Sequence, residues 1–139
     1  MRIAAFRSRL RAFLRHSEEV ARAWGLTPQR YLLLLTIKGS PGGTERISVG
    51  EVADHLSLSR NAVTEICTRA EQAGLIRREA GKDDRRVVCL RLTAEGDRRL
   101  CGAVRALEQD RGAIADAFGE LTASFDRQAT GSVSSAGRA

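Results

Sequence analysis

The segment from residue 48 to residue 92 constrains the fold more than any other part of the chain, because it begins with two helices separated by a tight turn. Ser48 and Glu51 have the spacing of a capping box, which predicts the start of a short helix. Ser59 is a suitable N-cap for a longer helix, which we predict to begin at Arg60 and to end near residue 73. This order predicts a helix-turn-helix.

A β-hairpin is predicted directly after the longer helix. Residues 75–78 favour a short strand, residues 81–84 favour a polar turn, and residues 87–92 alternate as a second strand does. The expected fold class is therefore mainly α with a small β-hairpin wing. It is a winged helix-turn-helix with dimerisation helices at its N- and C-terminal ends.

Both ends of the chain carry apolar residues at heptad spacing. From Ile3 to Trp24 the seam positions recur at intervals of 3 and 4 residues, and the same intervals recur from Leu100 to Phe125. Seams this regular favour packing against a second copy of the chain, although each also suits a helix that packs on its own domain. The predicted dimerisation residues are Ile3, Phe6, Leu10, Phe13, Leu107, Ile114, Phe118 and Leu121.

We predict a single domain over residues 1–128. Its winged helix-turn-helix core covers residues 27–92, and its dimerisation helices cover residues 1–24 and 94–126, the latter as one long final helix. Residues 129–139 are rich in Gly, Ser, Ala and Thr, which predicts a flexible tail.

The chain is basic, with a net charge of +6. Only Lys38 and Lys82 are lysines, and arginine, which supplies the rest, binds phosphates and guanine edges through a planar fork. The cations concentrate in residues 1–30 and 60–91, which fits a polyanionic partner, although genome composition explains an arginine excess equally well. No membrane span or signal peptide is visible, so a cytoplasmic protein is expected.

The longer helix divides into two faces. Val63, Cys67 and Ala70 lie on an apolar face, and the opposite face carries short hydrogen-bonding side chains. A helix in the major groove of DNA needs this division, since base edges present donors and acceptors there, but an ordinary amphipathic helix shows it too. The residues predicted to face DNA are Ser59, Arg60, Asn61, Thr64, Glu65, Thr68 and Arg69.

The tip of the predicted wing is basic. Lys82, Arg85 and Arg86 lie at this tip, and arginines on a projecting ribbon can enter the narrow minor groove of DNA. Asp84 is two residues from Arg86 and suits an orienting role towards its guanidinium. A charged tip alone is a common end for a solvated hairpin. The helix-turn-helix and the basic wing in this order favour double-stranded DNA as the partner.

No catalytic, metal or cofactor site is predicted. The common catalytic and nucleotide-binding motifs are missing, and neither His16 nor His55 has other ligand residues at metal-site spacing, so enzyme activity is not expected. Cys67, Cys89 and Cys101 fit small buried hydrophobic residues with reduced thiols. A redox sensor requires an exposed thiolate of low pKa, and no sequence feature indicates one.

Several short motifs accompany the predicted helix-turn-helix and wing. Around the wing they are Gly74-Leu75-Ile76-Arg77-Arg78, Asp84-x-Arg86 and Leu92-Thr93-x-x-Gly96. Upstream they are Gly25-Leu26-Thr27-Pro28-Gln29, Val52-Ala53-x-x-Leu56-x-Leu58-Ser59 and Val63-Thr64. Together these residues resemble the MarR family of bacterial transcription regulators, whose pattern is G-L-[IV]-x-R, then D-x-R, then L-T-x-x-G. The resemblance covers roughly residues 5 to 110.

The resemblance implies a mostly helical homodimer with interlocked terminal helices. It implies a recognition helix in the major groove, a wing arginine in the minor groove and a near-palindromic operator, because a two-fold protein matches two half-sites. Many relatives are repressors that small aromatic or phenolic ligands, or cysteine oxidation, release from DNA. A repressor with an effector of this kind is therefore expected.

Two features depart from the family pattern. Glu65 stands where the family often has a basic residue, and an acid there either accepts a hydrogen bond from a cytosine amine or repels phosphate. The C-terminal part looks short, since relatives usually have a second distinct C-terminal helix. Two other functions stay open: a winged-helix protein-interaction module, whose DNA binding would have a flat salt dependence, and a cysteine-based redox-sensing regulator.

Overall fold

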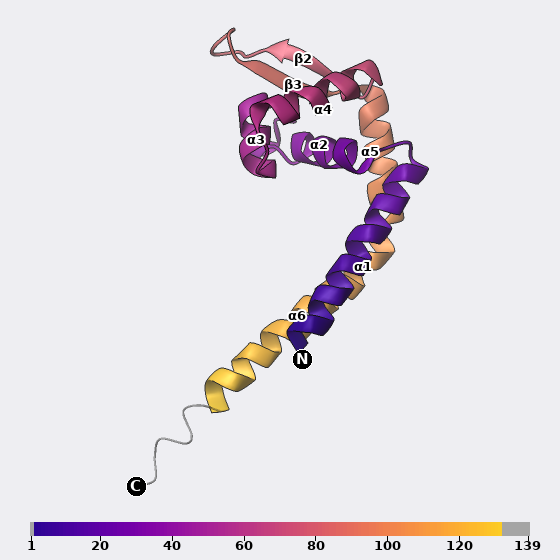
Figure 1. Ribbon diagram of the computed structural model, residues 1–139, viewed down its shortest axis with the longest axis vertical. Helices are drawn as coiled ribbons and strands as arrows, with labels where there is room; N and C mark the ends of the chain where they lie inside the picture. The colour runs from indigo at the N-terminus through magenta and orange to yellow at the C-terminus, as the bar shows by residue number, and fades with distance from the viewer. Residues whose placement is uncertain (1, 132–139) are drawn as a thin grey trace. The chain divides into compact units, whose positions relative to one another are not determined.

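The computed structural model describes residues 2–131. In chain order its elements are α1 (Arg2–Ala23), α2 (Pro28–Lys38), the 3-10 turn η1 (Pro41–Gly43), β1 (Ile47–Ser48), α3 (Val49–Leu56), α4 (Arg60–Gln72), β2 (Ile76–Ala80), β3 (Val88–Leu92), α5 (Ala94–Ala106) and α6 (Glu108–Gly131) (Figure 1). They confirm the mainly α fold with a small wing. The described residues divide into two compact units: residues 18–105, here called the winged unit, and residues 2–17 with 106–131, here called the terminal unit.

Helix α4 lies between α2 and the β2–β3 hairpin in the winged unit (Figure 1). Val63, Cys67 and Ala70 of α4 are buried, as the two-faced pattern predicts. The other large, fully buried side chains of this core are Leu26, Leu33, Leu34, Ile37, Val52, Leu75, Ile76, Leu90 and Leu100. This packing leaves the opposite face of α4 at the surface.

Serine caps set the starts of α3 and α4. The Ser48 hydroxyl accepts a hydrogen bond from the Glu51 backbone N–H at 3.1 Å, and the Ser59 hydroxyl accepts one from the Ala62 N–H at 3.1 Å. Each cap pairs a donor that the first turn of a helix leaves without a partner. The turn between the helices passes through Ser57 in the left-handed conformation, with φ of 54°. Both predicted helix starts are confirmed.

The predicted hairpin is confirmed as β2 and β3, and the sheet of the wing has a third strand, β1, that the sequence did not predict. The strand order is β1-β3-β2, and both pairings are antiparallel. Leu90 in the central strand pairs with Ile47 on one side and with Arg78 on the other. Strand β1 is only two residues long, and its second residue, Ser48, also caps α3. A strand of two residues is too short to show an alternation of apolar and polar residues, so the sequence did not predict β1.

Thr93 ties the end of α4 to the start of α5. Its backbone N–H donates to the Leu75 carbonyl at 3.0 Å, and its hydroxyl donates to the Gly74 carbonyl at 2.6 Å. The same hydroxyl accepts a hydrogen bond from the Gly96 N–H at 3.0 Å. At Gly96 the backbone of α5 lies so close to the Leu75 carbonyl that a Cβ atom at this position would overlap it. This contact explains why a threonine and a glycine occur at this spacing.

The prediction of one long final helix was wrong. The helix breaks at Leu107, which is buried, so α5 and α6 are distinct helices. A single residue outside the helices leaves the apolar spacing intact, so the heptad seam runs across the break. The sequence also suggests that the C-terminal part lacks a second distinct helix. Helix α6 is such a helix, so this expectation was wrong too. Helix α6 also continues to Gly131, beyond the predicted start of the tail at residue 129, and residues 132–139 lie outside the described residues.

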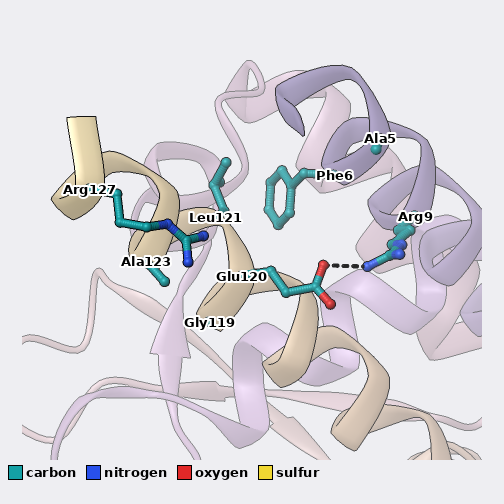
Figure 2. Close-up of a pocket in the computed structure, with 8 residues that line it drawn as sticks. All are labelled: Ala5, Phe6, Arg9, Gly119, Glu120, Leu121, Ala123 and Arg127. Atoms are coloured by element: carbon teal, nitrogen blue, oxygen red, sulfur yellow. Dashed lines mark hydrogen bonds and ion pairs between the residues drawn. The ribbon is translucent and has the colours of Figure 1, made fainter. Parts of the chain in front are cut away.

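In the terminal unit, α6 contacts α1 through an aromatic pair and an ion pair. The rings of Phe6 and Phe118 meet edge to face with centroids 4.7 Å apart. Arg9 Nη1 lies 2.9 Å from Glu120 Oε2 beside an open pocket of about 530 Å³ (Figure 2). Although apolar seams run along these helices, none of the helices within residues 2–131 is long and apolar enough to cross a membrane.

Candidate nucleic-acid interface

The N-terminal half of the exposed face of α4 carries polar side chains that are free for a ligand. Arg60, Asn61 and Thr64 are exposed, and among the described residues no hydrogen bond or ion pair engages their side chains. The contacts that Thr64 does make use its backbone carbonyl. The predicted exposure of these three residues is therefore confirmed, whereas their contact with DNA stays a prediction.

The C-terminal half of the same face is engaged within the protein. Glu65 and Arg69 form an ion pair of 2.6 Å along one turn of the helix. The Thr68 hydroxyl donates to the Thr64 carbonyl at 2.9 Å and accepts a hydrogen bond from Arg78 Nη2 at 3.1 Å. The predicted DNA-facing residues thus fall into two groups, one free and one already paired.

The turn of the wing is ordered by its own hydrogen bonds. The Gly81 N–H donates to the Val87 carbonyl at 2.8 Å, and the Val87 N–H donates to the Asp84 carbonyl at 3.1 Å. Asp84 Oδ1 accepts a hydrogen bond from the Arg86 backbone N–H at 3.0 Å and lies 3.9 Å from its Nε. The position of Asp84 therefore suits the orienting role that the sequence predicts. Lys82, Arg85 and Arg86 all extend from the surface.

An acidic residue joins the arginines at the base of the wing. Arg77 and Arg91 are direct cross-strand partners, an arrangement in which like charges repel. Glu79 lies 3.0 Å from Arg77, 3.3 Å from Arg46 and 4.0 Å from Arg91, and so offsets this repulsion. The cations at the wing tip have no comparable acidic centre among the described residues, since the nearest carboxylate to Arg86 is that of Asp84.

Transcriptional regulators are among the known proteins that are similar to this chain. A sequence model of the MarR family matches residues 24–87, from the end of α1 to the turn of the wing. A candidate transcriptional regulatory protein for the hcr operon of Thauera aromatica is 30% identical over 106 residues, which are 76% of this chain and 61% of the relative. The HTH-type transcriptional repressor MdtR of Bacillus subtilis is 37% identical over 73 residues, 52% of this chain and 44% of the relative.

Residues 24–87 of this chain are thus similar to the MarR family. The chain spans less than two thirds of the length of either of these curated relatives. Among solved structures, a mutant MarR of E. coli complexed with operator DNA superposes with a TM-score of 0.69 at 19% identity, covering 89% of this chain and 90% of that one. The likeness shows that the two proteins share the MarR winged-helix fold.

Sequence reasoning noted Arg78 only as part of a MarR motif and missed its contacts. Its guanidinium reaches from β2 to α4, where it donates to the Thr68 hydroxyl and, at 3.5 Å, to the Thr64 carbonyl. The alternation of the strand could have revealed these contacts. Arg78 is the cross-strand partner of the buried Leu90, whereas its neighbour Arg77 bonds Glu79. A cation in register with buried residues is expected to have a specific partner.

Of the three cysteines that the sequence suggests to be buried, Cys67 alone is buried in the structure. Cys67 is fully buried, and this burial raises the pKa of its thiol. Cys89 and Cys101 are half-buried, and all three are free thiols. Within residues 2–131 no group of three or more His, Cys, Asp or Glu side chains is placed to hold a metal ion.

Proposed function

We propose that this chain is a DNA-binding transcriptional regulator of the MarR family that recognises a near-palindromic operator as a homodimer. The observation that carries the proposal is the free polar face formed by Arg60, Asn61 and Thr64 on a helix beside an exposed basic wing. In helix-turn-helix proteins the N-terminal residues of the recognition helix contact base edges. Helix α4 therefore lies in the major groove, and Arg86 enters the adjacent minor groove.

The similar proteins support this proposal. The E. coli MarR structure contains operator DNA, and the Bacillus subtilis relative is named a repressor. We extend DNA binding and repression to this chain because residues 24–87, which match the family, include the whole of α4 and the turn of the wing. The same proposal places the protein in the cytoplasm, where bacterial DNA lies.

Different residues of the interface take different parts. Asn61 and Thr64 present hydrogen-bonding groups to bases, whereas Ser59 holds the helix start next to the phosphates. Lys82 and Arg85 contact the phosphates beside the minor groove that Arg86 enters. The predicted base contacts of Glu65, Thr68 and Arg69 require that their present pairings open or carry over to DNA.

A second copy of the chain is proposed to cover the apolar side chains of the terminal unit. Ile3 is 54% exposed and Phe118 is 47% exposed, an unfavourable state for large apolar side chains in water. Of the other predicted dimerisation residues, Leu107 is buried, the side chain of Ile114 lies outside those that the structure describes, and four are half-buried: Phe6, Leu10, Phe13 and Leu121. A dimer formed through the exposed seam would have the two-fold symmetry that a near-palindromic operator requires.

The decisive experiment is fluorescence anisotropy with labelled duplex DNA from upstream of the gene of this protein, beside a scrambled duplex. We expect a salt-dependent preference for the native duplex, because phosphate contacts release counterions and base contacts discriminate. Asn61→Ala should lose this preference while it retains binding to the scrambled duplex. Equal affinity of the wild type for both duplexes, repeated with several upstream fragments, would contradict sequence-specific recognition.

Separate measurements test the dimer, the repressor and the effector. Analytical ultracentrifugation should give a dimer for the wild type and a larger monomer fraction for Phe118→Glu, with Glu108→Gln as an exposed control on the same helix. Run-off transcription from the bound promoter should fall when the protein is added. A panel of phenols and benzoates, added to the DNA complex, tests for an aromatic effector by the release of labelled DNA.

A further inference from the structure

The β2–β3 hairpin packs on α4 through one of its two faces (Figure 1). Arg78 belongs to that face, because it is the cross-strand partner of the buried Leu90 and its guanidinium bonds α4. Side chains alternate between the two faces of a strand, so Arg77, Glu79 and Arg91 lie on the opposite face. We call this solvent-facing surface the outer face of the sheet.

The outer face carries an excess of positive charge. Arg77 and Arg91 are direct cross-strand partners, and like charges in such positions repel each other. Glu79 Oε1 lies 3.0 Å from Arg77 Nε. Glu79 Oε2 lies 3.3 Å from Nη2 of Arg46, the residue before β1, and 4.0 Å from Arg91 Nη1. Three guanidiniums thus share one carboxylate, which leaves this cluster with a charge of 3 − 1 = +2.

The two cross-strand arginines have hydrogen-bond donors that no bond within residues 2–131 uses. A guanidinium has five N–H donors. The hydrogen bond of Arg77 uses Nε, and the contact of Arg91 with Glu79, at 4.0 Å, is beyond hydrogen-bonding distance. Their side chains are 55% and 36% exposed, so a ligand in solution can reach both.

A carboxylate is the group that this cluster already binds, in the form of Glu79. Guanidinium and carboxylate groups match in shape and form paired, charge-assisted hydrogen bonds. Because Arg77 and Arg91 are side by side on neighbouring strands, a carboxylate from another molecule can contact both of them. Two such carboxylates would balance the remaining charge of the cluster. The outer face therefore suits a ligand that carries several carboxylates.

We propose that the outer face of the sheet binds an acidic segment of another protein, whose carboxylates contact Arg77 and Arg91. A protein segment is favoured over nucleic acid by the position of this face, which is turned away from α4. This step rests on the proposed function, in which α4 faces DNA. The regulator can then hold DNA on one side of the hairpin and its partner on the other.

The test is fluorescence anisotropy with a labelled octapeptide of alternating Ser and Glu, in about 0.15 M salt, where long-range charge effects are screened. Alternation places its carboxylates on one side of an extended chain. An octapeptide of alternating Ser and Gln is the neutral control, and we expect the wild type to bind the acidic peptide alone. Arg77→Gln and Arg91→Gln should each weaken this binding by about threefold to fivefold.

Arg85→Gln is the matched control variant. It removes the same charge from the exposed turn of the wing, outside the cluster around Glu79. Its affinity for the acidic peptide should equal that of the wild type. If Arg85→Gln loses as much affinity as Arg77→Gln, the peptide responds to net charge alone, and the site on the outer face is overturned.

Glu79→Gln tests the same site with the opposite sign. It removes the acid that competes for the arginines and keeps the size of the side chain. We expect the acidic peptide to bind this variant about threefold to fivefold more tightly than the wild type, a gain that misfolding cannot produce. Unchanged or weaker peptide binding, with the circular dichroism of the wild type, would contradict the proposal.

Unlabelled duplex DNA separates the outer face from the DNA interface. The anisotropy of the bound peptide should stay high when the duplex is added, and Arg77→Gln should bind DNA as the wild type does. Displacement of the peptide by DNA, or an equal loss of peptide and DNA affinity in Arg77→Gln, would overturn the proposal. If no duplex binds, the proposed function fails, yet peptide binding by the variants still decides whether the outer face holds carboxylates.

Discussion

Glu65 Oε1 lies 2.6 Å from Arg69 Nη2, one turn further along the exposed face of α4. Both side chains lie on the surface that we propose to face DNA. Exposed ion pairs of this kind contribute little to stability, so this one matters mainly for charge. In the free protein Arg69 is compensated, which limits its attraction to phosphate.

Glu65→Gln should therefore strengthen binding to any duplex. We expect the slope of log K against log salt to increase by about 0.9, since Arg69 becomes free to neutralise one phosphate, and the preference for the operator to fall. Anisotropy at several salt concentrations measures both quantities. Glu18→Gln makes the same change of charge on α1 and should have no such effect. If the slope does not change, Arg69 does not reach the DNA backbone.

Arg86→Ala should weaken operator binding while the protein stays folded. The Arg86 side chain is 95% exposed, and its ordered contact with Asp84 Oδ1 uses the backbone N–H, which alanine retains. Loss of a charge-assisted contact predicts a decrease of about tenfold or more in affinity. Asp84→Ala should cause a smaller loss, because it loosens the turn but keeps the cation. An Arg86→Ala protein with wild-type affinity would remove the wing from the mechanism.

Gly96→Ala should destabilise the winged unit. A Cβ at this position overlaps the Leu75 carbonyl, so the backbone must shift, at a cost of about 1–3 kcal/mol in the free energy of unfolding. Gly112→Ala is the matched control within a helix, because no heavy atom lies within 4 Å of its Cβ position. That change should stabilise by up to about 1 kcal/mol. Urea unfolding measures both, and equal effects of the two substitutions would contradict the close contact.

Acid should unfold the protein in part through the first turn of α5. Hydrogen bonds from Arg98 and Arg99 lower the pKa of Glu95 to about 2, and a hydrogen bond from Lys38 lowers the pKa of Asp97. Both carboxyls bind protons more weakly when folded, so their stabilisation is complete above the unfolded pKa of Glu95, 4.5, and is lost as the pH falls towards 2.

The melting temperature, followed by circular dichroism, should consequently fall over that pH range. In the double variant Glu95→Gln with Asp97→Asn the fall should be shallower, because neither side chain then titrates. A wild-type melting temperature that stays constant from pH 4.5 to pH 2 would show that these pairs add no stability.

Cys67 should resist alkylation in the folded protein. It is fully buried and its thiol pKa is raised by that burial, whereas the thiolate is the reactive form. Mass spectrometry after iodoacetamide treatment should find Cys67 modified only when urea is present. Rapid native modification of Cys67, together with the loss of DNA binding on oxidation, would instead favour the redox-sensing alternative.

The parts of the fold that the sequence could predict are those with local signals. Ser48 and Ser59 mark helix starts through side chains that bond their own first turn, and α4 shows its buried face through spacing alone. The break at Leu107 and the strand β1 have no such signal, since a one-residue break keeps the apolar period and a two-residue strand has none.

The candidate site shows the same division. Exposure of Arg60 and Asn61 follows from the helical period, and the sequence predicts it. The bond from Arg78 to Thr68 joins residues ten positions apart on a strand and a helix, and depends on how β2 packs against α4. The close approach of the Arg60 guanidinium to Gly50 likewise depends on how α3 and α4 pack together. Contacts of this kind require tertiary structure.

The hydrogen bonds of Thr93 join the segment after α4 directly to the start of α5. Gly74 and Leu75 lie just beyond Ala73, the C-cap of α4, and Gly96 lies in the first turn of α5. Thr93 is hydrogen-bonded to all three. A rotation of α5 must therefore either carry the C-terminal end of α4 with it or break these bonds. Thr93 therefore couples the position of α5 to that of α4, the helix that we propose to face DNA, through hydrogen bonds of 2.6 to 3.0 Å.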